Sequence, residues 1–121
     1  MSITLKMLMF MIDFDKIIGR NALTFVDFFA SWCGPCQAMH PVIDRFQEQM
    51  RGRVDVYKVN IDAPDAAPVV RRYGIRSVPT LMLFRRGEVL WRHSGMMGYE
   101  ELTNKFRQFE QEEQHARPVE Y

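Results

Sequence analysis

Cysteine is scarce in this chain of 121 residues, because Cys33 and Cys36 are the only two. So few cysteines exclude the small secreted proteins that depend on several disulfides for their stability. A chain of this length forms one domain and buries roughly two-thirds of its surface, so it needs no disulfide in order to fold. The two cysteines are therefore available for chemistry.

Net charge is also nearly absent, since 16 basic residues are balanced by 15 acidic ones and leave a formal charge of +1. Proteins that bind nucleic acid or an anionic membrane surface have a clear basic excess. The balance therefore predicts neither as the main partner. We find no internal repeat, and we expect one domain over residues 1–110, followed by a polar helix end and tail over residues 111–121.

Long hydrophobic runs are missing as well. The apolar stretch Met7–Ile12 is far too short to cross a membrane, and Asp13 follows it at once. No small-residue site of the kind that ends a signal peptide is present. We interpret Leu5–Phe10 as the opening strand of a cytoplasmic protein.

Hydrophobic periodicity predicts alternating strands and helices. The run Leu23–Ala30 is almost wholly apolar, as in a strand that is covered on both faces. The other predicted elements are helices at Asp13–Ile18, Cys33–Met50, Ala66–Arg72 and Tyr99–Gln114, and strands at Val54–Asp62, Thr80–Phe84 and Val89–His93. Residues from His115 onward show no periodicity. The order β-α-β-α-β-α-β-β-α indicates an α/β fold whose central mixed sheet has helices on both faces.

One pentapeptide, Trp32-Cys33-Gly34-Pro35-Cys36, stands where the apolar strand ends and the long helix begins. This setting turns a C-x-x-C spacing into a redox hypothesis. Three residues apart on one helical turn, the two sulfurs face the same side and can close a small disulfide. Unpaired N–H groups and the helix dipole stabilise a thiolate at the helix start, where Cys33 lies, while Cys36 lies one turn deeper.

A metal site is the rival chemical interpretation of these residues. Cys36 and His40 are four residues apart on one helix, as two ligands of one ion could be. Structural zinc requires four ligands, and only His93 and His115 remain as further histidines. We therefore expect no metal.

Asp27 is an acid inside a strand that we expect to be buried on both faces. A buried and unpaired carboxyl has a raised pKa, and it could accept a proton from Cys36. A carboxylate at a strand end that reaches water or caps a helix explains the residue equally well. Lys58, the only charged residue in Tyr57–Ile61, fits a lysine whose ammonium extends from a strand end to solvent.

Four segments, in consistent order between about Val26 and Phe109, resemble one family. They are Val26–Cys36, Lys58–Asp62, Tyr73–Thr80 and Leu83–Val89. In these segments the chain resembles the thioredoxin family, itself a standard example of the C-x-x-C motif. The resemblance implies the thioredoxin fold and a monomeric oxidoreductase that reduces disulfides in client proteins. It also implies recharging by an NADPH-dependent thioredoxin reductase, with the redox-active disulfide Cys33–Cys36 and no bound cofactor.

The resemblance also implies a role for each residue of the site. Cys33 is the nucleophile, and Cys36 resolves the mixed disulfide that Cys33 forms with the substrate. Asp27 accepts the proton of Cys36, and Lys58 tunes Asp27.

The residues around the sulfurs gain further roles from the resemblance. Within the family, the pair Gly34-Pro35 goes with a reducing protein rather than an oxidant. The Val78–Pro79 peptide bond is implied to be cis and to face the dithiol, which leaves the backbone of Val78 free to bind an extended substrate strand. The expected apolar docking rim consists of Trp32, Ile75, Val78, Gly95 and Met96.

Two other functions stay open beside this one. The same dithiol could serve a disulfide oxidant or isomerase, which an oxidising potential would favour. The domain could also be a non-redox binding module, whose function would survive the replacement of both cysteines by serine.

Overall fold

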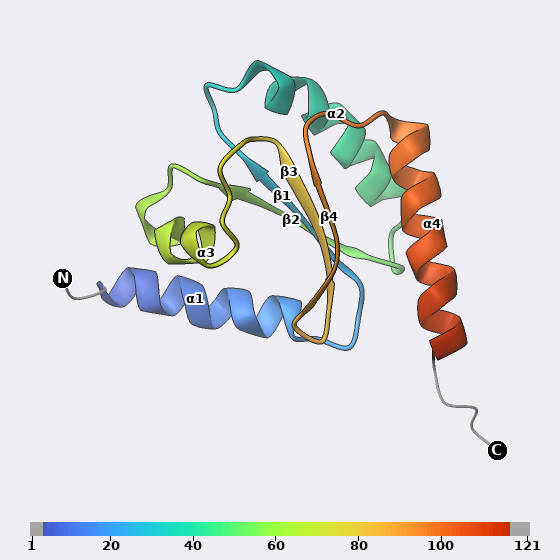
Figure 1. Cartoon of the computed structure of the whole chain (residues 1–121), viewed down its shortest axis with the longest axis horizontal. Coiled ribbons are helices and arrows are strands. Elements are labelled where there is room, and N and C mark those ends of the chain that lie inside the picture. The colour runs from blue at the N-terminus through green and yellow to red at the C-terminus, as the bar shows by residue number, and fades with distance from the viewer. Residues whose placement is uncertain (1–3, 117–121) are drawn as a thin grey trace.

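The structure, a computed structural model, describes residues 4–116 and has one central sheet with helices on both faces (Figure 1). Its elements are α1 (Leu5–Ile18), β1 (Thr24–Phe29), α2 (Gly34–Gln49), β2 (Asp55–Asn60), the 3-10 helix η1 (Pro64–Ala66), α3 (Ala67–Arg72), β3 (Thr80–Arg85), β4 (Glu88–Ser94) and α4 (Tyr99–Ala116). The strand order is β2-β1-β3-β4. β1 pairs with β2 in parallel, whereas β3 is antiparallel to both β1 and β4. The predicted α/β class and mixed sheet are confirmed.

The N-terminal segment is helical, so the strand predicted at Leu5–Phe10 is wrong. α1 begins after Thr4, whose Oγ1 accepts a hydrogen bond of 3.3 Å from the N–H of Met7. Phe14 and Ile18, one helical turn apart, are both buried. A short apolar run fits a strand and a buried helix equally well, and here the four-residue spacing of these side chains suits the helix. As a result, β2 lies at one edge of the described sheet.

Alternate side chains of β1 enter two separate cores. Phe25 packs on the side of α2, where its ring centroid lies 5.2 Å from that of Phe46. Val26 and Phe28 belong to the core on the other face, which is covered by α1 and α3. Because side chains alternate along a strand, Asp27 lies on the α2 side of the sheet.

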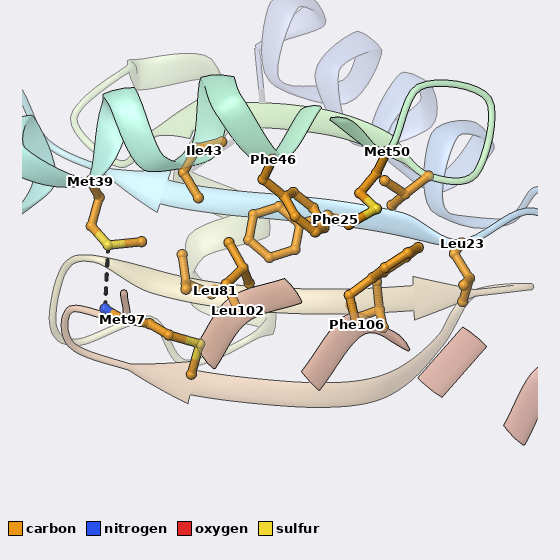
Figure 2. Packing of buried hydrophobic residues seen from close by; sticks show 12 residues of the cluster. Leu23, Phe25, Met39, Ile43, Phe46, Met50, Leu81, Met97, Leu102 and Phe106 are labelled. Carbon is orange, nitrogen blue, oxygen red and sulfur yellow. Dashed lines mark hydrogen bonds between the residues drawn. The ribbon is translucent and has the colours of Figure 1, made fainter. Parts of the chain in front are cut away.

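The apolar face predicted for the long helix is confirmed. Met39, Ile43 and Phe46 of α2, and Met50 at its C-cap, all point into the core between this helix and the sheet (Figure 2). The segment before α4 is joined to the same core, because the N–H of Met97 donates to Sδ of Met39 at 3.3 Å. α2 is therefore anchored along its whole length, which holds its first turn in place at the end of β1.

The C-terminal half follows the prediction with small shifts. β3 and β4 are joined by Arg86 and Gly87, whose φ values of 51° and 80° suit a tight hairpin turn. The helix predicted at Tyr99–Gln114 is confirmed as α4, which continues two residues further, to Ala116. Residues 117–121 of the predicted tail lie outside the described chain. No helix within residues 4–116 combines the length and the apolar character needed to cross a membrane.

Candidate functional site

The two cysteines lie at the start of α2, just beyond the carboxyl end of β1. A disulfide joins them, with their Cα atoms 5.2 Å apart. Cys33 is the N-cap residue of α2, and Cys36 belongs to its first turn. Cys33 is 5% exposed and Cys36 is 1% exposed, so the sulfur at the helix start is the one nearer the surface.

One backbone hydrogen-bond donor points at the sulfur of Cys33. The N–H of Cys36 donates to Sγ of Cys33 at 3.1 Å, as in an N-cap. Pro35 occupies the first turn, where its missing N–H leaves no donor unpaired. The helix N-terminus and this N–H both favour negative charge on the sulfur. Once the disulfide is reduced, the site therefore stabilises the Cys33 thiolate.

The loop before β3 approaches the disulfide from the side. Sγ of Cys33 lies 3.6 Å from the carbonyl oxygen of Val78, and Val78 packs against the small buried cluster that Ala30 forms with the two cysteines. The Val78–Pro79 peptide bond is cis, as the family resemblance implies. The carbonyl of Pro79 accepts a hydrogen bond of 2.9 Å from the N–H of Gly95, whose φ of 99° favours glycine. The structure thus brings Val78 to the sulfurs and joins Gly95 to the same loop.

Large apolar side chains are exposed in the segments that border the disulfide. Trp32 is 70% exposed, and its Nε1 donates to Oδ2 of Asp62 at 2.7 Å. Met96, directly after Gly95, is 55% exposed. Exposed apolar surface of this kind suits the binding of other proteins. Ile75 is not part of this rim, because it is buried in the core beneath α1 and α3, which corrects the expectation from the sequence.

Asp27 is completely buried, and neither of its carboxylate oxygens has a hydrogen-bond partner among the described residues. Burial raises the pKa of Asp27 from 3.8 to about 6, and the positive charge of Lys58 limits the rise. A carboxyl with this pKa can gain and lose a proton near neutral pH. The geometry favours the buried acid over a strand-end carboxylate that reaches water.

Lys58 lies opposite Asp27 in the parallel register of β1 and β2, but its ammonium group forms its hydrogen bond with another carboxylate. Its Nζ donates to Oδ1 of Asp44 at 2.8 Å. Lys58 therefore acts on Asp27 through its charge, without a hydrogen bond. Sequence reasoning missed Asp44, although Cys36, His40 and Asp44 follow one another at four-residue intervals and so share one face of α2.

His40 lies beside the site without forming a ligand cluster. Its ring packs edge-on against Phe29 with the centroids 5.1 Å apart, and Phe29 in turn packs against the buried cluster that contains the two cysteines. Across residues 4–116 we find no group of three or more His, Cys, Asp or Glu side chains arranged to hold a metal ion.

Comparison with known proteins agrees with this geometry. The family model described as Thioredoxin matches residues 7–108. A thioredoxin of Rickettsia felis is 51% identical over 73 residues, which span 60% of this chain and 68% of the relative. Thioredoxin 1 of Chlorobaculum tepidum is 40% identical over 93 residues, 75% of this chain and 89% of the relative. A thioredoxin of Haemophilus influenzae is 34% identical over 97 residues, 79% of this chain and 89% of the relative.

A mixed α/β sheet with a disulfide-forming cysteine pair at the start of a helix defines a thiol–disulfide oxidoreductase. The extent of the matches makes the assignment more specific. The chain belongs to the thioredoxin family, and it is a protein disulfide reductase.

Proposed function

We propose that this protein works in the cytoplasm as a thioredoxin domain over residues 1–110. It reduces disulfides in client proteins and is recharged by an NADPH-dependent thioredoxin reductase. The main support is the N–H of Cys36 on the sulfur of Cys33 at a helix N-terminus, which favours the nucleophilic thiolate. The dithiol itself holds the two electrons, so the proposal needs no bound cofactor.

In the first step, the Cys33 thiolate attacks one sulfur of a client disulfide. A bond forms between that sulfur and Sγ of Cys33 while the client S–S bond breaks. The departing client sulfur leaves as a thiolate and takes a proton from solvent. The greater exposure of Cys33 suits it to this attack, because Cys36 is almost wholly enclosed.

In the second step, Cys36 resolves the mixed disulfide. Its thiol loses a proton to the Asp27 carboxylate, and its sulfur then attacks Sγ of Cys33. The second client sulfur leaves as a thiolate, and the Cys33–Cys36 disulfide forms. Two electrons have then passed to the client, and the reductase returns them by thiol exchange from NADPH. The pKa of about 6 suits Asp27 to this proton transfer, and Lys58 tunes that pKa.

The client binds across the exposed rim beside the sulfurs. Trp32 and Met96 supply apolar surface that adapts to many sequences. The backbone of Val78, next to the cis Pro79, aligns an extended client segment beside Cys33. The Val78 carbonyl oxygen lies only 3.6 Å from Sγ of Cys33, so a segment bound to this backbone lies close to the reacting sulfur. Gly95 leaves open space at the edge of this loop.

A trapping experiment tests the proposal directly. Reduced Cys36→Ser protein, mixed with insulin as the disulfide client, should accumulate a covalent adduct, since Cys33 attacks and nothing resolves the product. Cys33→Ser is the matched control and should form little adduct. Non-reducing electrophoresis and mass spectrometry measure both. The wild-type protein should also couple insulin reduction to NADPH consumption when thioredoxin reductase is added.

Two results would contradict the proposal. One is an adduct that forms equally well with either single variant, because the two cysteines would then have no distinct roles. The other is function of the Cys33→Ser/Cys36→Ser protein at the wild-type level, which would favour a binding module without redox chemistry.

A further inference from the structure

α1 is apolar on two opposite faces, although only one of them contacts the sheet. Phe14 and Ile18 fill the core on the inner face. On the outer face, large side chains at positions i, i+3, i+4 and i+7 are between 45% and 71% exposed. This outer stripe consists of Leu5, Leu8, Met9 and Ile12.

Such a stripe differs from scattered apolar residues on a surface. A surface helix of a soluble domain normally has polar residues on its outer face. Four of the seven large hydrophobic side chains exposed in the described chain belong to the outer stripe. The others are Trp32 and Met96 of the docking rim and the isolated Val89 on β4. A contiguous apolar surface away from the active site indicates an interface.

The charges beside the outer stripe indicate what covers it. Lys6 and Asp13 are exposed and seven residues apart, so they lie on the same flank of the stripe, two turns from each other. Neither has an ion-pair partner among the described residues. Asp15 is already paired with Arg72 of α3. Lys16, one turn beyond the end of the stripe, is also exposed and has no ion-pair partner among the described residues. Beside the stripe itself, one flank therefore has one free charge of each sign.

We propose that the outer stripe is a dimer interface with a second copy of this chain, in which the two α1 helices pack antiparallel. A two-fold axis near Leu8 and Met9 sets Leu5 of one copy opposite Ile12 of the other. With this symmetry, Lys6 of one copy and Asp13 of the other lie on the same side of the helix pair. Their positions along the helices differ by about 3 Å, which corresponds to two residues. Each charge pair then forms twice. This arrangement replaces the monomer expected from the sequence.

The alternative of a lipid surface suits these charges less well. Helices that lie in a membrane interface have lysine and arginine along the edges of their apolar face. Here Lys6 shares its flank with Asp13, so the pattern complements a second copy rather than an anionic surface. The interface also leaves the dithiol accessible, because α1 and α2 lie on opposite sides of the sheet (Figure 1).

The interface is small, which sets the expected strength of the dimer. A single pair of helices buries less than the ~1,200 Å² at the lower limit of stable complexes. We therefore expect a reversible dimer whose dissociation constant is micromolar or weaker. Sedimentation equilibrium of the wild-type protein over a wide concentration range should show the apparent mass rise from one chain to two.

Substitutions separate this dimer from unspecific association. Met9→Lys should abolish the rise in mass, whereas Val89→Lys, the same change at an exposed apolar residue outside the stripe, should leave it unchanged. Lys6→Asp and Asp13→Lys should each weaken the dimer about tenfold, because attractive pairs become repulsive. The double variant Lys6→Asp/Asp13→Lys should restore it. Near-UV circular dichroism and the rate of insulin reduction should be those of the wild type throughout.

Three outcomes would overturn the proposal. The first is a wild-type protein that stays monomeric at every concentration. The second is a dimer that the double variant fails to restore, since the helices would then not pair antiparallel. The third is a monomer that instead binds vesicles of phosphatidylcholine and phosphatidylserine through the outer stripe.

Discussion

Asp27 lies where its charged form is disfavoured, and this placement gives the site a proton acceptor. The residue is on the α2 side of β1, completely buried, and its oxygens have no hydrogen-bond partner in the described chain. Burial raises its pKa to about 6, and Lys58, which is bonded to Asp44, lowers it only in part. A carboxyl held in this way destabilises the fold whenever it is ionised.

The destabilisation of the folded protein by Asp27 should increase as the pH rises. Its pKa is about 6 in the folded state and near 3.8 when exposed, so the folded protein binds this proton more tightly than the unfolded protein. The penalty is absent below the lower value, and it reaches roughly 3 kcal/mol above about pH 6. The free energy of unfolding of Asp27→Ala, minus that of the wild type, should therefore increase by roughly 2–3 kcal/mol between about pH 4 and about pH 8. Urea unfolding at each pH measures it.

A second variant shows whether the charge of Lys58 has the proposed effect. Lys58→Met removes the cation that lowers the pKa of Asp27, so the midpoint of the pH dependence should move upward.

In stopped-flow assays Asp27→Ala should slow resolution of the mixed disulfide more than the first attack. A stability difference that is the same at all pH values would show that Asp27 does not titrate in the folded protein in this range.

Single residues differ in how far the sequence predicts them. The cysteine pair and Asp27 were found because a local motif and an acid in an apolar run are visible without any knowledge of the fold. Asp44 was missed as the partner of Lys58, since their contact depends on how α2 crosses β2. Ile75 was assigned to the rim, but its burial depends on the packing of α1 and α3.

At the scale of elements, the prediction fails in the first half of α1, where Leu5–Phe10 is helical instead of a strand, whereas the helix predicted at Asp13–Ile18 is confirmed as the second half of α1. Met7–Ile12 is apolar at every position, so neither a period of two nor a period of 3.6 stands out. In the structure, Phe14 is the centre of an aromatic cluster with Phe28, Tyr73 and Phe84, at centroid distances of 5.9–6.4 Å. These contacts join Phe14 to residues that are far away in the sequence. A short stretch of sequence around α1 therefore does not reveal them.

Two substitutions in α1 test its helical orientation. Phe14→Ala should lower the free energy of unfolding by about 3–5 kcal/mol, because it empties an aromatic core. Ile12→Ala, on the outer stripe, should change it by less than about 0.5 kcal/mol when measured at low protein concentration. Chemical unfolding followed by circular dichroism compares them. A large loss from Ile12→Ala with little from Phe14→Ala would contradict the orientation of this helix.

At the scale of the whole molecule, the sheet assembles the site from three distant segments. Trp32 to Cys36 follow β1, the Val78–Pro79 loop precedes β3, and Gly95 follows β4. The central position of β1, next to β3, brings these segments to one end of the sheet. The order of elements predicted this end correctly, because the connections around β1 do not depend on the N-terminal strand that proved to be a helix.

The central claim is that Cys33 and Cys36 form a reducing dithiol, and their reduction potential tests it most directly. The protein would be equilibrated in thiol–disulfide buffers of defined potential, with the fluorescence of Trp32 as the readout and Trp91→Phe to remove the other tryptophan. A reducing dithiol should show a reversible two-electron transition near the reference value for thioredoxins, about −270 mV. A value near −180 mV or above, as in disulfide isomerases and oxidants, would contradict a reductant, and no transition at all would contradict redox function altogether.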